Sequence, residues 1–281
     1  MRADCLAEEP MMNDWTKKVA LVTGASSGIG RATALAFAAR GADLVLSGRS
    51  SAALEATADE ARARGVEVRA LAGDLREESF VVHVVGEAKR AFGRLDALVN
   101  GAGVGFPGLA SQGITDQWRE MLETNVLALG LVCREGVGAM GENGGTIVNV
   151  SSLAGREAAP GFALYCATKH AVNGFSNALR LELEGTGIRV LVIEPGQTMT
   201  SFARHVPHEH LVQLATTLGL QPSEVPDFSG GHAPAAFVDA VLKANPERFL
   251  AAEEVAEAIV EAVSSADESL TLVSLRPETR S

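Results

Sequence analysis

Aromatic residues and cysteines are scarce in this chain. Only 5% of its 281 residues are Phe, Trp or Tyr, and Tyr165 is the single tyrosine. The three cysteines, Cys5, Cys133 and Cys166, are widely and irregularly spaced. This spacing favours reduced thiols over a disulfide framework or a metal-binding knuckle.

Dense basic segments and long apolar runs are also lacking. The chain has 24 Lys and Arg against 35 Asp and Glu, a formal net charge of -11, and no basic block suited to a run of phosphates. Nucleic acid is therefore not expected as a partner. No apolar run approaches the roughly 18 residues that span a bilayer, so no membrane contact is expected.

The N-terminal stretch MRADCLAEEPMMNDWTKK is acidic and polar, whereas a signal peptide is basic and then apolar. We therefore expect a cytoplasmic protein. Residues 1–15 are expected to be a loose N-terminal extension, and Met11 or Met12 could equally be the natural start.

Apolar segments alternate with helical patterns along the chain, which has 47% hydrophobic residues and can bury one large core. The pattern predicts strands at 17–24, 42–48, 66–74, 96–103, 145–152, 188–196 and 270–275, and helices at 30–40, 51–64, 77–92, 115–140, 165–184 and around 253–265. Repeated strand, helix and strand predict an α/β fold, a Rossmann-like doubly wound parallel sheet of about seven strands. We expect a single domain over residues 16–281.

The periodic pattern fails between residues 200 and about 234, where prolines and glycines accumulate. Such a stretch is either a lid over a substrate site or a surface excursion. Its three histidines, His205, His208 and His210, lack a rigid helical spacing, so we predict no metal site.

A glycine-rich motif, TGASSGIG at 23–30, follows the first strand and opens a helix. Gly24, Gly28 and Gly30 could let the backbone approach a pyrophosphate at a helix N-terminus. The alternative is that glycine is needed at this turn for steric reasons alone.

The second predicted strand ends in LSGRS, where an NAD-binding fold usually places an acidic residue to grip the ribose hydroxyls. Gly48 and Arg49 stand there instead. Arg49, with Ser47, Ser50 and Ser51 nearby, could bind a 2′-phosphate, so NADP is predicted in preference to NAD. The alternative is an ordinary solvated arginine.

Tyr165 and Lys169 are four residues apart in a predicted helix and therefore share one face. A nearby ammonium favours the phenolate and so lowers the pKa of a phenol, which makes the tyrosine useful as an acid or base. The alternative is an unremarkable half-buried pair.

The motifs taken together resemble the short-chain dehydrogenase/reductase family from about Lys17 to Pro277. They are TGASSGIG, Asp74 in GDL, NGAG (100–103), Asn125 in TNV, VSS (150–152), YCATK (165–169) and EPG (194–196), in the family's order and spacing. The resemblance implies an oxidoreductase that transfers a hydride between a nicotinamide cofactor and a small alcohol or carbonyl substrate, while the prediction of NADP depends on Arg49 alone.

Four catalytic residues carry over from this resemblance. Ser152 would stabilise the developing alkoxide and Tyr165 would exchange its proton. Lys169 would hold the nicotinamide ribose and lower the pKa of the tyrosine, while Asn125 would anchor a water linking Lys169 to solvent. Ser151 is the alternative serine.

The cofactor residues implied by the family form three groups along the chain. They are Gly24, Ser26, Ser27, Gly28, Ile29 and Gly30 at the pyrophosphate turn, Arg49, Asp74 and Leu75 around the adenosine, and Asn100, Ala102, Gly103, Tyr165, Lys169, Pro195, Gly196, Thr198 and Thr200 along the rest of the cofactor.

Three features of the sequence depart from the family pattern. Gly101 replaces the second asparagine of NNAG, and Ser27 replaces a basic residue common in NADP-preferring members. The ending LTLVSLRPETRS lacks the common glycine pair and resembles the branch of serine and 3-hydroxy acid dehydrogenases.

The family resemblance also implies a homodimer or homotetramer, paired through the helices at 115–140 and 165–184. Apolar residues of those helices, including Val126, Leu127, Leu131, Phe175 and Leu179, could cover one another. The alternative function is a non-catalytic NADP-binding sensor or scaffold.

Overall fold

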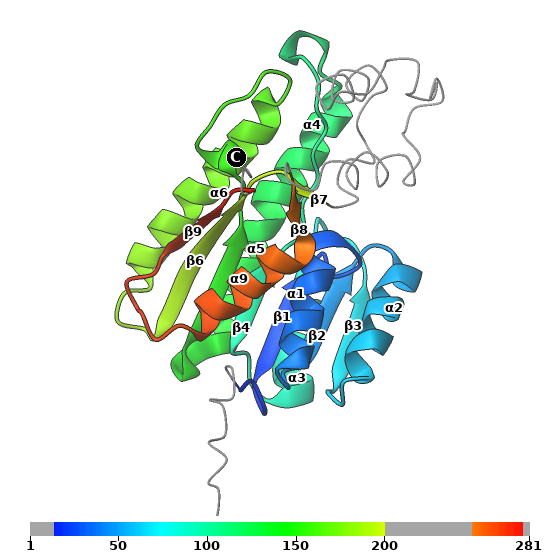
Figure 1. Cartoon of the computed structure of the whole chain (residues 1–281), viewed down its shortest axis with the longest axis vertical. Helices are drawn as coiled ribbons and strands as arrows, with labels where there is room; N and C mark the ends of the chain where they lie inside the picture. The colour runs from blue at the N-terminus through cyan, green and yellow to red at the C-terminus, as the bar shows by residue number, and fades with distance from the viewer. Residues whose placement is uncertain (1–13, 200–248, 278–281) are drawn as a thin grey trace, which may run out of the picture.

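The structure is a computed structural model that describes residues 14–199 and 249–277. Seven parallel strands form one sheet in the order β3-β2-β1-β4-β5-β6-β9 (Figure 1). The strands are β1 (Val19–Thr23), β2 (Asp43–Gly48), β3 (Val68–Ala72), β4 (Ala97–Asn100), β5 (Gly145–Val150), β6 (Ile188–Pro195) and β9 (Leu272–Leu275). This confirms the predicted Rossmann-like doubly wound sheet.

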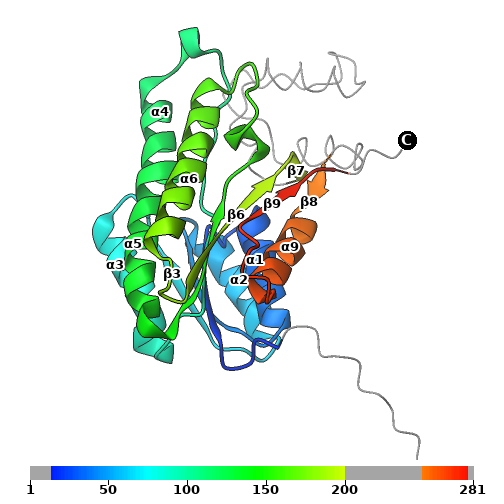
Figure 2. The same ribbon diagram turned by 90° about the vertical axis from the view of Figure 1, so that its left-hand side faces the viewer.

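Helices cover both faces of the sheet (Figure 2). One face carries α1 (Gly28–Ala39), α2 (Ser51–Arg62) and α9 (Ala252–Ser264), and the other carries α3 (Glu78–Phe92), α4 (Thr115–Leu122), α5 (Leu129–Met140) and α6 (Ala163–Glu182). Each face has its own apolar core, with Phe37 and Ile259 fully buried in the first and Leu98 and Met140 in the second.

The buried strands explain the continuous apolar runs of the sequence. All five residues of β1 are buried, as are seven of the eight in β6, because helices lie on both sides of a parallel sheet. On α9, the predicted stripe of Val255, Ile259 and Val263 is buried.

The predicted helix at 115–140 consists of three segments. A π-helical segment, η2 (Glu123–Ala128), joins α4 to α5, and such wide turns often mark functional sites. Short 3-10 turns occur at η1 (Ala110–Gln112), η3 (Gly141–Asn143) and η4 (Leu153–Gly155), and β7 (Thr198–Met199) pairs with β8 (Leu250–Ala251). Sequence periodicity predicted neither the π segment nor this small second sheet.

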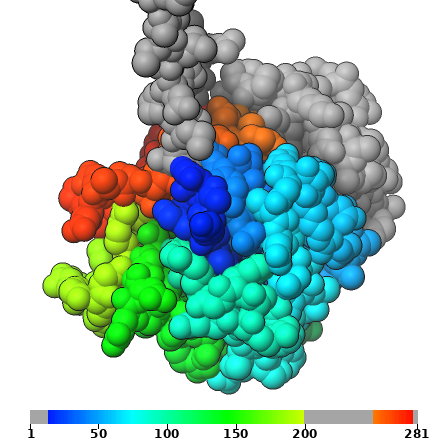
Figure 3. Space-filling view, turned by 90° about the horizontal axis from the view of Figure 1, so that it is seen from below, coloured from blue at the N-terminus to red at the C-terminus, as the bar shows by residue number. Residues whose placement is uncertain are grey.

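Parallel strands place all their carboxyl ends at one edge of the sheet, which is where ligands bind in doubly wound folds. Figure 3 shows the molecule from below, at the opposite edge of the sheet, where the blue, cyan, green and orange-red parts of the chain meet. The predicted N-terminal extension (1–15) falls mostly outside the described residues, and the predicted lid (200–234) and Thr200 fall wholly outside them.

Candidate active site

A groove of about 380 Å³ lies at the carboxyl ends of β1, β2 and β4. Its lining includes the glycine-rich turn, the end of β2, the GDL segment and the NGAG segment. The lining residues are Gly24, Ser26, Ser27, Gly28, Ile29, Gly30, Gly48, Arg49, Ser50, Gly73, Asp74, Leu75, Gly101, Ala102, Gly103, Val104, Gly105 and Thr124.

Most cofactor residues predicted for the adenosine and pyrophosphate therefore share one groove. Several residues of the groove wall were not predicted from the sequence, among them Gly73, Val104, Gly105 and Thr124. Thr124 directly precedes the predicted Asn125, so adjacency to a motif was the signal that could have identified it.

Three glycines let backbone pack against backbone beneath the groove. A Cβ on Gly24, which has φ +70°, would lie 2.8 Å from the Ala102 nitrogen, and one on Gly30 would lie 2.4 Å from the Gly24 oxygen. A Cβ on Gly101 would lie 2.8 Å from the Thr23 oxygen. The departure from the family's NNAG thus has a local steric reason, and the bare turn suits the close approach of a pyrophosphate.

Arg49 stands at the end of the groove beside β2. Its Nη1 donates to Glu120 Oε1 of α4 at 2.8 Å, and its side chain is 55% exposed. Glu120 therefore already forms an ion pair with the guanidinium group that was predicted from the sequence to bind a 2′-phosphate. The nearby serines are placed differently: Ser47 is fully buried and Ser50 caps α2 by accepting from the Ala53 nitrogen.

Asp74 lies in the same end of the groove and pairs with Arg76. The Arg76 Nε contacts both carboxylate oxygens at 3.1 and 3.0 Å, and Nη2 contacts Oδ2 at 2.6 Å. Hydrogen bonding from Arg76 holds the pKa of Asp74 below its ordinary value. This carboxylate is thus ionised and partly engaged by its own neighbour.

Ser152, Tyr165 and Lys169 come together where β5 meets α6. Ser152 precedes η4, and its side chain is hydrogen-bonded to that of Tyr165. The Lys169 Nζ lies 5.7 Å from the centroid of the Tyr165 ring. The alternative serine, Ser151, is buried and donates instead to the Lys169 carbonyl oxygen at 3.3 Å, so the geometry favours Ser152.

The pKa values of this pair depart from the simple picture of an ammonium that activates a phenol. Tyr165 as a residue is partly exposed, but burial nevertheless raises the pKa of its phenol to about 12, and the hydrogen bond with Ser152 opposes this rise. Burial lowers the pKa of Lys169 to about 8. The ammonium donates to the Val150 carbonyl oxygen at 2.9 Å. The hydrogen bond with Ser152 is thus what lowers the pKa of the phenol, against the larger effect of burial.

Asn125 lies in the π-helical segment and is 1% exposed. Its Oδ1 accepts from the Val104 nitrogen at 2.8 Å, while its Nδ2 donates to the Val104 oxygen at 2.8 Å and to Thr168 Oγ1 at 3.1 Å. Asn125 thus fastens a wall of the groove to the residue that precedes Lys169.

Asn100 lies beneath the groove and is 3% exposed. Its Nδ2 donates to Asn149 Oδ1 at 2.9 Å and contacts Cys133 Sγ at 3.2 Å. The amide is thus engaged within the protein, which the sequence analysis did not predict. Burial raises the pKa of the Cys133 thiol to about 12.

The segment assigned to the nicotinamide carboxamide follows β6. Pro195 is buried and accepts a long hydrogen bond of 3.4 Å from Ser152 Oγ, and Thr198 Oγ1 donates to the Gly196 oxygen at 3.0 Å. Phe162, which is 37% exposed, meets the Tyr165 ring edge-on at a centroid distance of 6.2 Å. An apolar side chain therefore flanks the phenol.

The described ranges, 14–199 and 249–277, contain no cluster of His, Cys, Asp and Glu that could hold a metal ion. His205, His208 and His210 fall in the stretch between them. None of the helices in those ranges is long and apolar enough to cross a membrane.

Comparison with known proteins identifies the family. The short chain dehydrogenase profile matches residues 18–210, and the chain belongs to that family. It is an oxidoreductase with a fold that holds a nicotinamide dinucleotide.

Two curated relatives illustrate the range of activities. The chain is 37% identical over 194 residues to a 3beta-hydroxysteroid dehydrogenase of Mediterraneibacter gnavus, covering 68% of this chain and 69% of the relative. It is 41% identical over 185 residues to a sulfoacetaldehyde reductase of Chromohalobacter salexigens, covering 64% and 72%.

Two solved structures share the fold and hold different cofactors. A short chain dehydrogenase/reductase of Burkholderia phymatum in complex with NAD superposes with a TM-score of 0.75 at 28% identity, covering 94% of this chain and 90% of that one. An alcohol dehydrogenase of Thermococcus sibiricus complexed with 5-hydroxy-NADP gives 0.74 at 24% identity, covering 94% and 98%.

Proposed function

We propose that the protein interconverts an alcohol and a ketone or aldehyde with NADP(H), using Ser152, Tyr165, Lys169 and Asn125. The observation that carries this proposal is the hydrogen-bonded Ser152 and Tyr165 pair beside the buried Lys169, next to the glycine-floored groove. A bound nicotinamide dinucleotide supplies or accepts the hydride.

The proton chemistry falls to Tyr165 and Ser152. A pKa of about 12 keeps the phenol protonated at neutral pH, which is the state required to donate a proton to a carbonyl oxygen during reduction. The Ser152 hydroxyl would donate to the same oxygen and stabilise its developing negative charge.

Lys169 and Asn125 support this pair. Lys169 is buried, and its ammonium is oriented by the Val150 carbonyl oxygen, so it would hold ribose hydroxyls at a fixed place. Asn125 orients the groove wall through Val104, and the water-linked proton path through Asn125 is part of the same proposal.

The predicted cofactor residues would contact two different parts of the cofactor. The turn and groove residues Gly24, Ser26, Ser27, Gly28, Ile29, Gly30, Asp74, Leu75, Ala102 and Gly103 would receive the dinucleotide, with Asn100 supporting the floor. Pro195, Gly196, Thr198 and Thr200 would meet the carboxamide.

The preference for NADP rests on Arg49. Its side chain is 55% exposed and can turn from Glu120 to a 2′-phosphate. The test is the dissociation constant of each oxidised cofactor by titration calorimetry for wild type and Arg49→Gln. Arg49→Gln should weaken NADP but not NAD, and equal effects on both would remove Arg49 as the selective residue.

The reaction is tested by following nicotinamide absorbance with NADPH and with NADH. The substrate panel should span ketones, aldehydes, 3-oxo acids, 3-oxosteroids and sulfoacetaldehyde, the last two suggested by the relatives. Tyr165→Phe should abolish turnover while retaining the cofactor affinity and melting temperature of the wild type. Near-complete retention of activity would refute the acid/base role.

A non-catalytic sensor or scaffold is the rival function. It would need the groove but not the Ser152 and Tyr165 hydrogen bond. Tight cofactor binding without hydride transfer to any carbonyl class on the panel would favour it.

We also propose a homodimer or homotetramer in the cytoplasm that acts on a small molecule. Exposed apolar side chains gather on α4, η2 and α6, with exposed fractions of 46% for Leu122, 57% for Leu127 and 36% for Phe175, and these elements are in contact. Leu127→Glu should lower the mass measured by light scattering, and a monomeric wild type would refute the assembly.

A further inference from the structure

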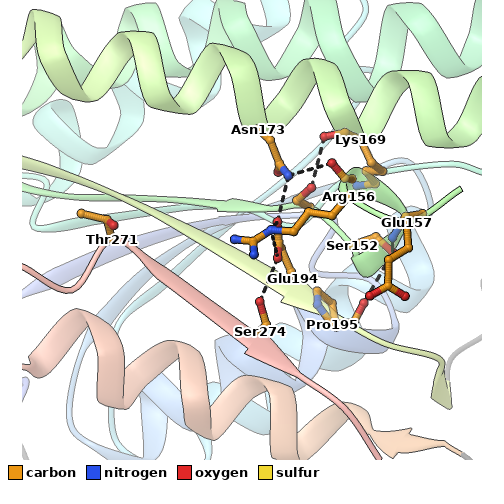
Figure 4. A network of polar contacts seen from close by, with 12 residues as sticks. Ser152, Arg156, Glu157, Lys169, Asn173, Glu194, Pro195, Thr271 and Ser274 are labelled. Carbon is orange, nitrogen blue, oxygen red and sulfur yellow. Dashed lines mark hydrogen bonds and ion pairs between the residues drawn. The ribbon is translucent and has the colours of Figure 1, made fainter.

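Glu194 is a fully buried carboxylate without a part in the proposed reaction. It lies at the end of β6, directly before Pro195, and is 0% exposed. Three donors from three other parts of the chain converge on it (Figure 4): Arg156 Nε at 2.9 Å, Asn173 Nδ2 at 2.8 Å and Ser274 Oγ at 2.8 Å.

A buried carboxylate is costly to desolvate, and apolar side chains of similar volume often give equal stability. A buried carboxylate whose hydrogen-bond donors are all in place can, however, fix one arrangement of the elements that supply those donors. An apolar residue cannot perform this role. The question is which elements Glu194 fixes.

The first element is the turn that carries Ser152. Ser152 caps η4 (Leu153–Gly155), and Arg156 follows that turn directly. Asn173 Nδ2 also donates to the Gly155 oxygen at 3.1 Å. The carboxylate therefore holds the far end of the Ser152 turn through Arg156 and, by way of Asn173, through Gly155.

The second element is the helix that carries the other reactive groups. Tyr165, Lys169 and Asn173 follow one another at intervals of four residues on α6, so they share a face. Gly155 lets the turn sit directly on this face, because a Cβ there would lie 2.8 Å from Asn173 Nδ2 and 3.0 Å from the Lys169 oxygen.

The Ser152 hydroxyl itself is loosely held by its own backbone contacts. It accepts from the Ala154 nitrogen at 3.2 Å, the upper end of the range of about 2.7–3.2 Å for N–H···O bonds, and donates to the Pro195 oxygen at 3.4 Å, beyond the range of about 2.5–3.0 Å for O–H···O bonds. The position of its Oγ is therefore set mainly by where the turn and β6 lie relative to α6. Glu194 joins all three.

We propose that Glu194 is a positioning residue that keeps Ser152 in hydrogen-bonding contact with Tyr165. The positioning can be tested without any substrate, whereas its catalytic consequence rests on the proposed Ser152 and Tyr165 chemistry. Ser274 extends the same brace to the edge strand β9.

The single tyrosine provides a direct readout. Incorporation of 3-fluorotyrosine labels only Tyr165, and its fluorine NMR resonance reports the loss of the hydrogen bond in Ser152→Ala. Glu194→Leu removes all three acceptor contacts at similar volume, while Glu194→Gln keeps an acceptor for Arg156 and Asn173 and can donate to Ser274.

We expect Glu194→Leu to shift the resonance toward that of Ser152→Ala, and Glu194→Gln to restore it toward wild type. In the Ser152→Ala background, Glu194→Leu should add no further shift. A wild-type resonance in folded Glu194→Leu, or an equal shift with and without Ser152, would overturn the proposal.

Two further variants keep the test decisive. Asn173→Ala removes the link between α6 and the turn at a half-buried site, and it should shift the resonance in the same direction as Glu194→Leu. It therefore provides the test if Glu194→Leu does not fold. Arg180→Gln is the matched control, because Arg180 joins α6 to β6 through the Val190 oxygen at 3.2 Å and to the residue before β9 through the Thr271 oxygen at 3.3 Å, without touching the turn. It should leave the resonance in place.

Once a substrate is known, the same pair of backgrounds gives a kinetic test. Glu194→Leu should lower kcat about tenfold at saturating cofactor with Ser152 present, since small misplacements of reactive groups cost one to two orders of magnitude. It should have less than about a twofold effect in Ser152→Ala. Equal losses in both backgrounds would assign Glu194 a purely structural role. If the wild type turns over nothing, the proposed function fails, while the fluorine shifts still decide the positioning.

Discussion

Lys169 is expected to destabilise the folded protein at neutral pH, and this can be measured. Burial lowers its pKa from the ordinary 10.5 to about 8, which corresponds to about 3 kcal/mol of stability lost at pH values below the folded pKa. Replacing it in Lys169→Met removes this penalty but leaves the Val150 oxygen without its donor, which costs about 1–2 kcal/mol. The variant should therefore be more stable than wild type by about 1–2 kcal/mol at pH 7.

The sign of the pH dependence follows from proton counting. Above the folded pKa of about 8 and below the unfolded value of 10.5, the unfolded chain binds the proton and the folded protein does not. Wild-type stability therefore rises with pH in this window relative to the variant. The advantage of Lys169→Met should shrink by about 2 kcal/mol between about pH 7 and about pH 9.5.

Urea unfolding at a series of pH values measures this difference, because all other titrating groups are common to both proteins. Lys89→Met, which removes an exposed lysine from α3, corrects for the change in net charge. A constant difference between Lys169→Met and wild type across the range would show that Lys169 titrates alike in both states, and would refute the reasoning.

Three other predictions address the groove and its floor. Glu120→Gln should tighten NADP binding relative to NAD by about fivefold or less, because it removes a carboxylate that competes for an exposed arginine; calorimetry with both cofactors checks this, and an unchanged ratio contradicts it. Gly101→Ala should lower the free energy of unfolding measured in urea by about 1–3 kcal/mol and weaken cofactor binding, because its Cβ would meet the Thr23 oxygen. Gly86→Ala, at a helical position where a Cβ would meet no neighbour, should raise the free energy of unfolding by up to about 1 kcal/mol. Cys133→Ala should not change the number of thiols that react rapidly with Ellman's reagent at neutral pH, since a thiol with a pKa of about 12 carries almost no thiolate; the loss of one fast thiol would be inconsistent with this.

The layers of the fold could be predicted from the sequence because each strand is covered on both sides. β1 and β6 are buried almost throughout, so their continuous apolar runs indicate strands of a parallel sheet covered by helices on both faces. The π segment at 123–128 could not be predicted, because its residues keep a helical pattern while only the backbone ladder changes.

The residue types of the site were also predictable, whereas the interactions between them were not. Spacing placed Tyr165 and Lys169 on one helical face, but nothing in the spacing indicates that α4 brings Glu120 to Arg49. That contact joins residues 71 positions apart and depends on the packing of α4. A cofactor preference inferred from Arg49 alone therefore omits the charge that Arg49 already faces.

The same distinction between spacing and environment applies to the lone tyrosine. A lysine one turn away favours the phenolate only to the extent that it is charged and close. Lys169 has a pKa of about 8 and directs its ammonium to Val150, while burial raises the pKa of Tyr165 to about 12. The phenol is therefore protonated at neutral pH, and the group that lowers its pKa is Ser152. Since the position of Ser152 depends on the turn held by Glu194, control of the phenol belongs as much to a buried carboxylate behind the site as to the lysine beside it.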